Sequence, residues 1–153
     1  MTGRESKLEN DMFFVCSLIE HIGRGTKNRR VDVVRQLGEK EIERLVELAD
    51  VFHCEPLENT AGDLTEKYGI TVGAFDNAGE CEYNLPTVFD IAKVYKRLAF
   101  SVAKTRGMPP AAALIAAYSS PISGKIDDYN SSMYFENPRY IYESYIAGEP
   151  LKE

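Results

Sequence analysis

The side chains best suited to binding chemistry lie in the basic segment GRGTKNRR, residues 23–30. It holds Arg24, Lys27, Arg29 and Arg30. The planar guanidinium fork of arginine matches phosphate and carboxylate oxygens, and glycine lets backbone amides approach an anion. The segment lacks the spacing of a phosphate-binding loop that follows a strand. It therefore predicts an anion-binding or partner-binding loop, and the alternative is a solvated turn that caps a helix or forms salt bridges.

A second group of cations lies in the segment 88–106. Its charged residues are Lys93, Lys96, Arg97, Lys104 and Arg106 against the single acid Asp90, an excess of four positive charges. The whole chain carries a net charge of −6, so its positive charge is unevenly distributed. We treat Lys93 and Arg97 as further candidates for binding an anion or a partner. If both basic groups share a face, that face suits an acidic partner.

The C-terminal part of the chain is rich in tyrosine, which has a large apolar face with a polar tip and is common at interfaces. Six of the nine tyrosines lie in the last 36 residues: Tyr118, Tyr129, Tyr134, Tyr140, Tyr142 and Tyr145. We predict that Tyr134, Tyr140, Tyr142 and Tyr145 form a partner surface or a homodimer interface. In the alternative, they pack the last helices onto the centre of the protein with their hydroxyls in water.

Catalytic and metal-binding patterns are weak. Asp50 and His53 lie one helical turn apart, as in carboxylate-bridged di-iron bundles, but His21 lacks a carboxylate at that spacing. Asp127 and Asp128 are neighbours, so on a helix they would point about 100° apart and could not work as a paired acid and base. The sequence therefore predicts no catalytic residue, no metal site and no cofactor, and it favours a binding protein over an enzyme.

A helix-turn-helix interpretation of the chain around Gly38 is disfavoured by charge. The segment 39–50 carries five acidic residues against Lys40 and Arg44, a net charge of −3 on the helix that would face phosphates. We therefore expect no nucleic-acid partner.

Length and composition indicate one globular domain. The 153 residues are 44% hydrophobic and 27% charged, which is enough for a self-sufficient core. Three widely spaced cysteines, an odd number, indicate reduced thiols and hence a cytoplasmic protein. The apolar run 12–19 is too short to span a bilayer and follows no signal-peptide pattern, so no membrane segment is expected.

The strongest helical pattern covers residues 88–106. Its apolar residues recur at steps of three and four, Thr87 and Asp90 form a capping-box pair, and Gly107 offers a left-handed stop. About 19 residues at 1.5 Å each span roughly 28 Å, the width of a small domain. We expect the shorter helices to pack across this one.

The remaining periodic segments also predict helices. They are 12–22 ended by Gly23, 31–37 ended by Gly38, 39–53, 56–68, 110–118, a stripe over 122–133, and a last helix after Asn137-Pro138. Residues 70–85 show no sustained period and predict a long irregular loop. The expected fold is an all-α, single-domain bundle of about six to eight helices over 10–147, with a flexible leader at 1–9 and a flexible tail at 148–153.

Two strings, FFVCSLIEHIGRGTKNRRVDVVRQLG and KIDDYNSSMYFENPRYIYESY, resemble small uncharacterised bacterial proteins of similar length. The resemblance implies no activity, ligand or catalytic residue. Our leading hypothesis is a helical protein-binding or regulatory module, such as an antitoxin-like or immunity-like partner. The alternative is a protein or enzyme that binds a small anionic molecule through its Arg-rich loop.

Overall fold

The structure is a computed structural model that describes residues 3–152, and within this range it contains helices and no β-strand. The helices are α1 (Gly3–Thr26), α2 (Arg30–Glu47), α3 (Ala49–Phe52), α4 (Leu57–Lys67), α5 (Asn77–Glu80), α6 (Val88–Arg106), α7 (Pro110–Ser119), α8 (Ser123–Ile126), a 3₁₀ turn η1 (Met133–Phe135) and α9 (Pro138–Ala147). The predicted all-α class is confirmed. The predictions for residues 1, 2 and 153 lie outside the described range.

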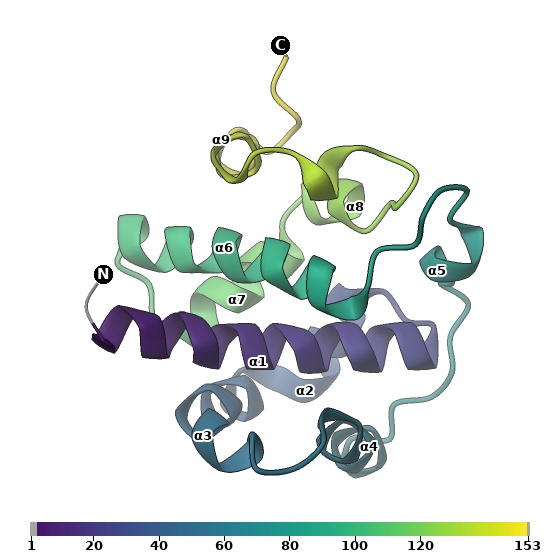
Figure 1. Cartoon of the computed structure of the whole chain (residues 1–153), viewed down its shortest axis with the longest axis vertical. Helices are drawn as coiled ribbons and strands as arrows, with labels where there is room; N and C mark the ends of the chain where they lie inside the picture. The colour runs from purple at the N-terminus through teal and green to yellow at the C-terminus, as the bar shows by residue number, and fades with distance from the viewer. Residues whose placement is uncertain (1–2, 153) are drawn as a thin grey trace.

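Helix α6 is the middle layer of the fold. Figure 1 shows α1 along one side of it, α9 and α8 on the other side, and α7 behind it, while α2, α3 and α4 lie beyond α1. The apolar stripe of α6 is buried in the core that these helices share. Its predicted start is confirmed, because the Thr87 hydroxyl accepts from Asp90 N at 3.0 Å and Thr87 N donates to the Asp90 carboxylate at 2.9 Å. Gly107 ends it in the left-handed conformation.

Helix α1 is longer at both ends than the sequence predicts. It begins at Gly3 and so includes most of the segment expected to be a flexible leader. Its first turns are held by ion pairs from Lys7 to Asp11 at 2.8 Å and from Lys96 to Glu9 at 3.4 Å. It also continues through Gly23, where the sequence predicts its end. A glycine is permitted inside a helix, and this one has a packing role described below.

The two helices predicted on either side of Gly38 are confirmed as two arms of α2. The backbone of Gly38 is not helical, with φ 82° and ψ 161°, so the arms meet at a kink. The second arm ends at Glu47 and is followed by the separate short helix α3. Its Glu41 carboxylate accepts from Lys67 at 3.1 Å and from the Tyr68 hydroxyl, which ties α2 to α4.

The segment 122–133 is not the continuous helical stripe that its spacing predicts. Helix α8 stops at Ile126, and an irregular turn leads to η1. Short polar side chains compete for backbone groups here: Asp128 accepts from Asn130 N at 3.0 Å, and the Ser131 hydroxyl donates to Lys125 O at 2.7 Å. The apolar side chains of the stripe are buried all the same.

The two segments predicted to be irregular are tied to the helices. In the loop 70–85, Gly73 N donates to Thr26 O at 2.8 Å, and the loop also forms the short helix α5. In the tail, Leu151 N donates to the Ser144 hydroxyl at 3.2 Å, and Leu151 O accepts from Tyr140 at 2.8 Å. The tail therefore contacts α9 as far as Leu151.

An ion pair lies in the centre of the protein between α1 and α2. Arg30 and Glu20 are 0% and 1% exposed, and Arg30 Nε lies 3.1 Å from Glu20 Oε1. Burial raises the pKa of Glu20, and the charge of Arg30 opposes that rise. Burial alone would lower the pKa of Arg30, but the neighbouring Glu20 raises it above its ordinary value. Because a buried guanidinium keeps its proton and needs a counter-charge, we assign Glu20 as ionised.

Gly23 makes room for this ion pair. It lies one turn after Glu20 on α1, and a Cβ atom placed on it would lie 2.3 Å from Cδ of Arg30. Arg30 cannot move away without stretching its bond to Glu20. Gly23 is therefore required by the packing of Arg30 and not by the end of a helix.

We predict that Gly23→Ala destabilises the protein by about 1–3 kcal/mol, the usual cost of overpacking a core. Gly25→Ala is the matched control, because Gly25 lies in the same helix and no atom would lie within 4 Å of a Cβ placed on it. There, alanine should stabilise the helix by up to about 1 kcal/mol. Urea unfolding followed by circular dichroism measures both changes, and equal effects of the two substitutions would contradict the packing role of Gly23.

Candidate functional site

The basic residues predicted at positions 24–30 do not converge on one anion site. Arg24 belongs to α1 and donates to Pro86 O at 2.9 Å, and its guanidinium lies 5.6 Å from the ring centre of Tyr129. Lys27 lies 3.9 Å from the Asp76 carboxylate. Arg29 is exposed at the start of α2.

Arg30 is the residue whose position differs most from the prediction. It was a candidate for binding an anion at the surface, and it is instead buried against Glu20. Its remaining donors reach Asn28 O at 2.8 Å, Asn77 Oδ1 at 3.3 Å and the Tyr129 hydroxyl at 3.4 Å. Every one of these partners is inside the protein, so Arg30 is not available to an external ligand.

Three further buried side chains with polar groups, Tyr118, Tyr95 and Asp127, continue from the ion pair, and the sequence pattern did not predict this arrangement. Tyr118 donates to Glu20 at 2.9 Å and its ring stacks on Tyr95 at 3.8 Å between centres. Tyr95 in turn donates to the Asp127 carboxylate at 2.7 Å. Asp127 is 7% exposed and is therefore buried. The available signal was its place beside Ile126 in the apolar stripe of residues 122–133.

These buried groups hold two loops against the bundle. Asn77, which accepts from Arg30, donates to Asp127 O at 3.0 Å. Asn130 then accepts from Glu82 N at 2.7 Å. The loop 70–86 and the segment 127–136 are thereby fixed relative to each other. They supply two sides of the surface groove described next.

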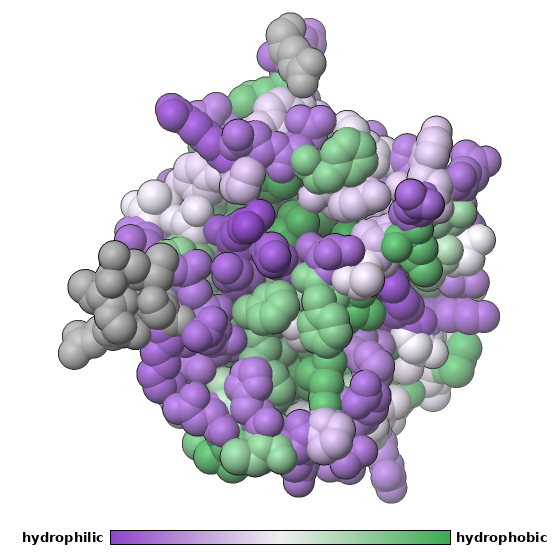
Figure 2. All heavy atoms as spheres, viewed as in Figure 1, coloured by the Kyte–Doolittle hydropathy of each residue, from purple (hydrophilic) through white to green (hydrophobic). Residues whose placement is uncertain are grey.

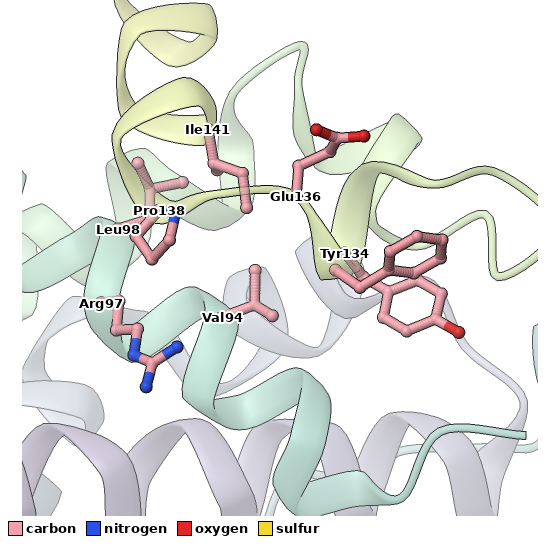
Figure 3. A pocket seen from close by; sticks show the side chains of 8 residues that line it. Val94, Arg97, Leu98, Tyr134, Glu136, Pro138 and Ile141 are labelled. Atoms are coloured by element: carbon pink, nitrogen blue, oxygen red, sulfur yellow. The ribbon is translucent and has the colours of Figure 1, made fainter.

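A pocket of about 110 Å³ lies between α6 and the segment that joins η1 to α9. Figure 3 shows Val94 of α6 and Ile141 of α9 pointing toward each other across it, with Pro138 beside Leu98. Arg97 lies at the α6 edge. The pocket therefore combines aliphatic side chains with the polar groups of Arg97, Tyr134 and Glu136.

A wider hollow of about 370 Å³ continues from this pocket. Val94, Arg97, Tyr134 and Phe135 line both, so the two form one groove, which we call the α6–α9 groove. The hollow adds these lining residues: Asn84, Leu85, Pro86, Asp90 and Lys93. Figure 2 shows apolar side chains at the bottom of a recess between α6 and the layer of α9, with hydrophilic side chains around it. The groove thus brings together predicted site residues from α6 and from the tyrosine-rich region.

The cations at this groove are available to a ligand. Lys93 and Arg97 are exposed, and among the described side chains no carboxylate lies within ion-pair distance of either. Asp90, one turn before Lys93, uses its carboxylate to cap α6. Glu136 also lines the pocket, but its carboxylate points away from Arg97 in Figure 3. The edge of the groove formed by α6 is therefore positively charged.

The four tyrosines predicted as a partner surface are half-buried and have different surroundings. Tyr134 lines the groove and packs edge-on against Phe135, with ring centres 5.0 Å apart. Tyr142 shares a 2.6 Å hydrogen bond with Thr105 of α6, and Tyr140 bonds Leu151 O. Tyr145 packs beside Tyr142. Tyr134 is thus the one among these four that lines the groove.

No group of three or more His, Cys, Asp or Glu side chains in 3–152 could hold a metal ion. Within the same range, no helix combines the length and the apolar character needed to cross a membrane.

Comparison with known proteins adds nothing to these observations, since no family model, curated protein or solved structure matches the chain.

We predict that Asp127→Asn makes the protein more stable relative to wild type as the pH rises. Burial, and then the charge of Glu20, raise the pKa of Asp127 from 3.8 to about 7. The folded chain therefore binds more protons than the unfolded chain between these values, so this carboxyl contributes stability below pH 4 that is lost as the pH rises through 7. Asparagine does not titrate and can still accept from Tyr95.

The difference in unfolding free energy between variant and wild type should shift by on the order of 2 kcal/mol in favour of the variant between pH 5 and pH 8. Urea unfolding at both pH values measures it. A difference that is the same at pH 5 and pH 8 would show that Asp127 does not carry the raised pKa.

Proposed function

We propose that this protein works by binding another protein, and that the α6–α9 groove is its binding surface. The observation that carries the proposal is the combination of apolar lining side chains with two exposed cations, Lys93 and Arg97, that have no carboxylate partner within residues 3–152. Phe135 and Leu85 line the same groove with 67% and 47% of their surfaces exposed. Exposed aromatic and aliphatic side chains around a recess are typical of protein interaction sites.

The alternative hypothesis, a small-anion protein that uses the Arg-rich loop, has less support. Arg30 is bound to Glu20, and Arg24 is bound to Pro86 O. Neither guanidinium faces the groove. The groove joins a pocket to a wider hollow that shares four of its lining residues, and this arrangement suits a segment of chain better than a compact metabolite.

Regulatory roles such as that of an antitoxin-like or immunity-like partner remain compatible with a binding groove. Such roles also need a surface that offers both apolar and charged contacts. A second copy of this chain is the competing partner. The cytoplasmic location predicted from the cysteines stays a prediction, and Cys16, Cys54 and Cys81 are unpaired thiols in the structure.

We predict that the groove selects peptides from a random display library and that Lys93→Glu abolishes the selection. The substitution reverses one of the two charges at the edge of the groove and leaves its apolar interior intact. Enrichment on the immobilised wild-type protein, compared with the variant, measures the effect.

Lys40→Glu is the matched control, because Lys40 is also an exposed lysine on a helix but belongs to α2, outside the groove. It changes the net charge by the same amount and should leave the selection intact. The proposal would be overturned if no peptide is enriched, or if both substitutions reduce enrichment equally.

A further inference from the structure

We infer that the α6–α9 groove recognises a short peptide segment in which an aliphatic residue of leucine size lies next to an acidic residue. This inference rests on the proposed function and specifies its ligand. The aliphatic side chain enters the pocket between α6 and α9, and the carboxylate pairs with Arg97. Each half of this ligand follows from a separate property of the site.

The size of the pocket sets the apolar half of the ligand. A dry cavity of about 150 Å³ lined by aliphatic and aromatic side chains accommodates benzene. The pocket here is about 110 Å³, and its aliphatic lining residues are Val94, Leu98, Pro138 and Ile141, with Arg97, Tyr134, Phe135 and Glu136 completing the lining. A four-carbon side chain fits that volume, whereas a tryptophan or tyrosine ring system does not.

Charge sets the other half. Arg97 lines both parts of the groove, and Lys93 lies one turn before it on the same face of α6. An arginine fork can hold a carboxylate through two parallel hydrogen bonds, and the second cation adds attraction. Since neither cation has a carboxylate partner among the described side chains, a ligand carboxylate displaces no existing ion pair. A neutral or basic residue at this place would leave both cations unpaired.

The shape of the groove favours a segment of chain as occupant. The 370 Å³ hollow beside the pocket shares four lining residues with it and has Leu85 and Phe135 on its sides. A peptide that places one side chain in the pocket can therefore continue along the hollow past Lys93. A second copy of this chain is a competing occupant, because its net charge of −6 provides carboxylates that could pair with Lys93 and Arg97. The experiment must therefore distinguish a bound peptide from a second copy.

The inference is tested by titrating the full chain with three blocked dipeptides and following the methyl resonances of Val94, Leu98 and Ile141 by NMR. The probes are acetyl-Leu-Asp-amide, acetyl-Leu-Asn-amide and acetyl-Ala-Asp-amide. We expect saturable shifts with the first probe, with a dissociation constant on the order of 1 mM, and at least tenfold weaker binding of the other two. Equal binding of all three, or no saturable shift, would overturn the inference.

Two variants assign each half of the recognition. Arg97→Gln should remove the preference for Asp over Asn, and Val94→Met, which fills the pocket, should remove the preference for Leu over Ala. Because Arg97 is exposed, its variant is expected to fold even if the methionine variant does not. A wild-type preference that survives Arg97→Gln would overturn the assignment of the carboxylate.

Two outcomes distinguish a failure of this inference from a failure of the proposed function. If the enrichment of library peptides depends on Lys93 but the peptides lack an aliphatic residue next to an acidic one, the inference is overturned while the proposed function is supported. Sedimentation that shows a dimer broken by Arg97→Gln would make a second copy the occupant and overturn the peptide inference.

Discussion

The buried ion pair between Arg30 and Glu20 is the interaction on which the arrangement of this protein depends. An uncompensated charge in a protein interior costs several kcal/mol, so the two residues must be brought together whenever the chain is folded. Arg30 also donates to Asn77 and to Tyr129, which come from two different loops. One guanidinium thus connects α1, α2, the loop 70–86 and the segment 127–136. A core of aliphatic side chains alone could not fix those loops so specifically, because apolar contacts have no preferred direction.

The groove at the surface depends on this polar interior. Pro86 lines the groove and accepts from Arg24, whose guanidinium also lies over Tyr129. Tyr129 packs edge-on against Tyr134, which lines both parts of the groove. Two of the predicted basic residues, Arg24 and Arg30, therefore hold the α6–α9 groove in place from inside, while Lys93 and Arg97 are exposed along it. The basic residues of the sequence are thus divided between the interior of the protein and the surface of the groove.

Local patterns predicted the helices well and the tertiary roles of polar residues poorly. The start and end of α6 were predicted because Thr87, Asp90 and Gly107 act on the neighbouring backbone. The segment 122–133 was misread because its apolar spacing is helical while its short polar side chains bind the backbone locally. Gly23 was interpreted as a helix end, because the reason for a glycine there is Arg30, which only the fold brings close. The same limit applies to the groove: its two sides are about 40 residues apart in the chain, and spacing alone cannot join them.

Amide hydrogen exchange of Arg30→Lys tests most directly whether the buried pair holds the groove in place. Lysine keeps the positive charge beside Glu20 but cannot supply the fork of donors to Asn77 and Tyr129. The account predicts that amides in the loop 70–86 and the segment 127–136 exchange at least about tenfold faster than in wild type, relative to those of α6 and α7. Exchange that speeds up in α2 alone, with both loops unchanged, would contradict it.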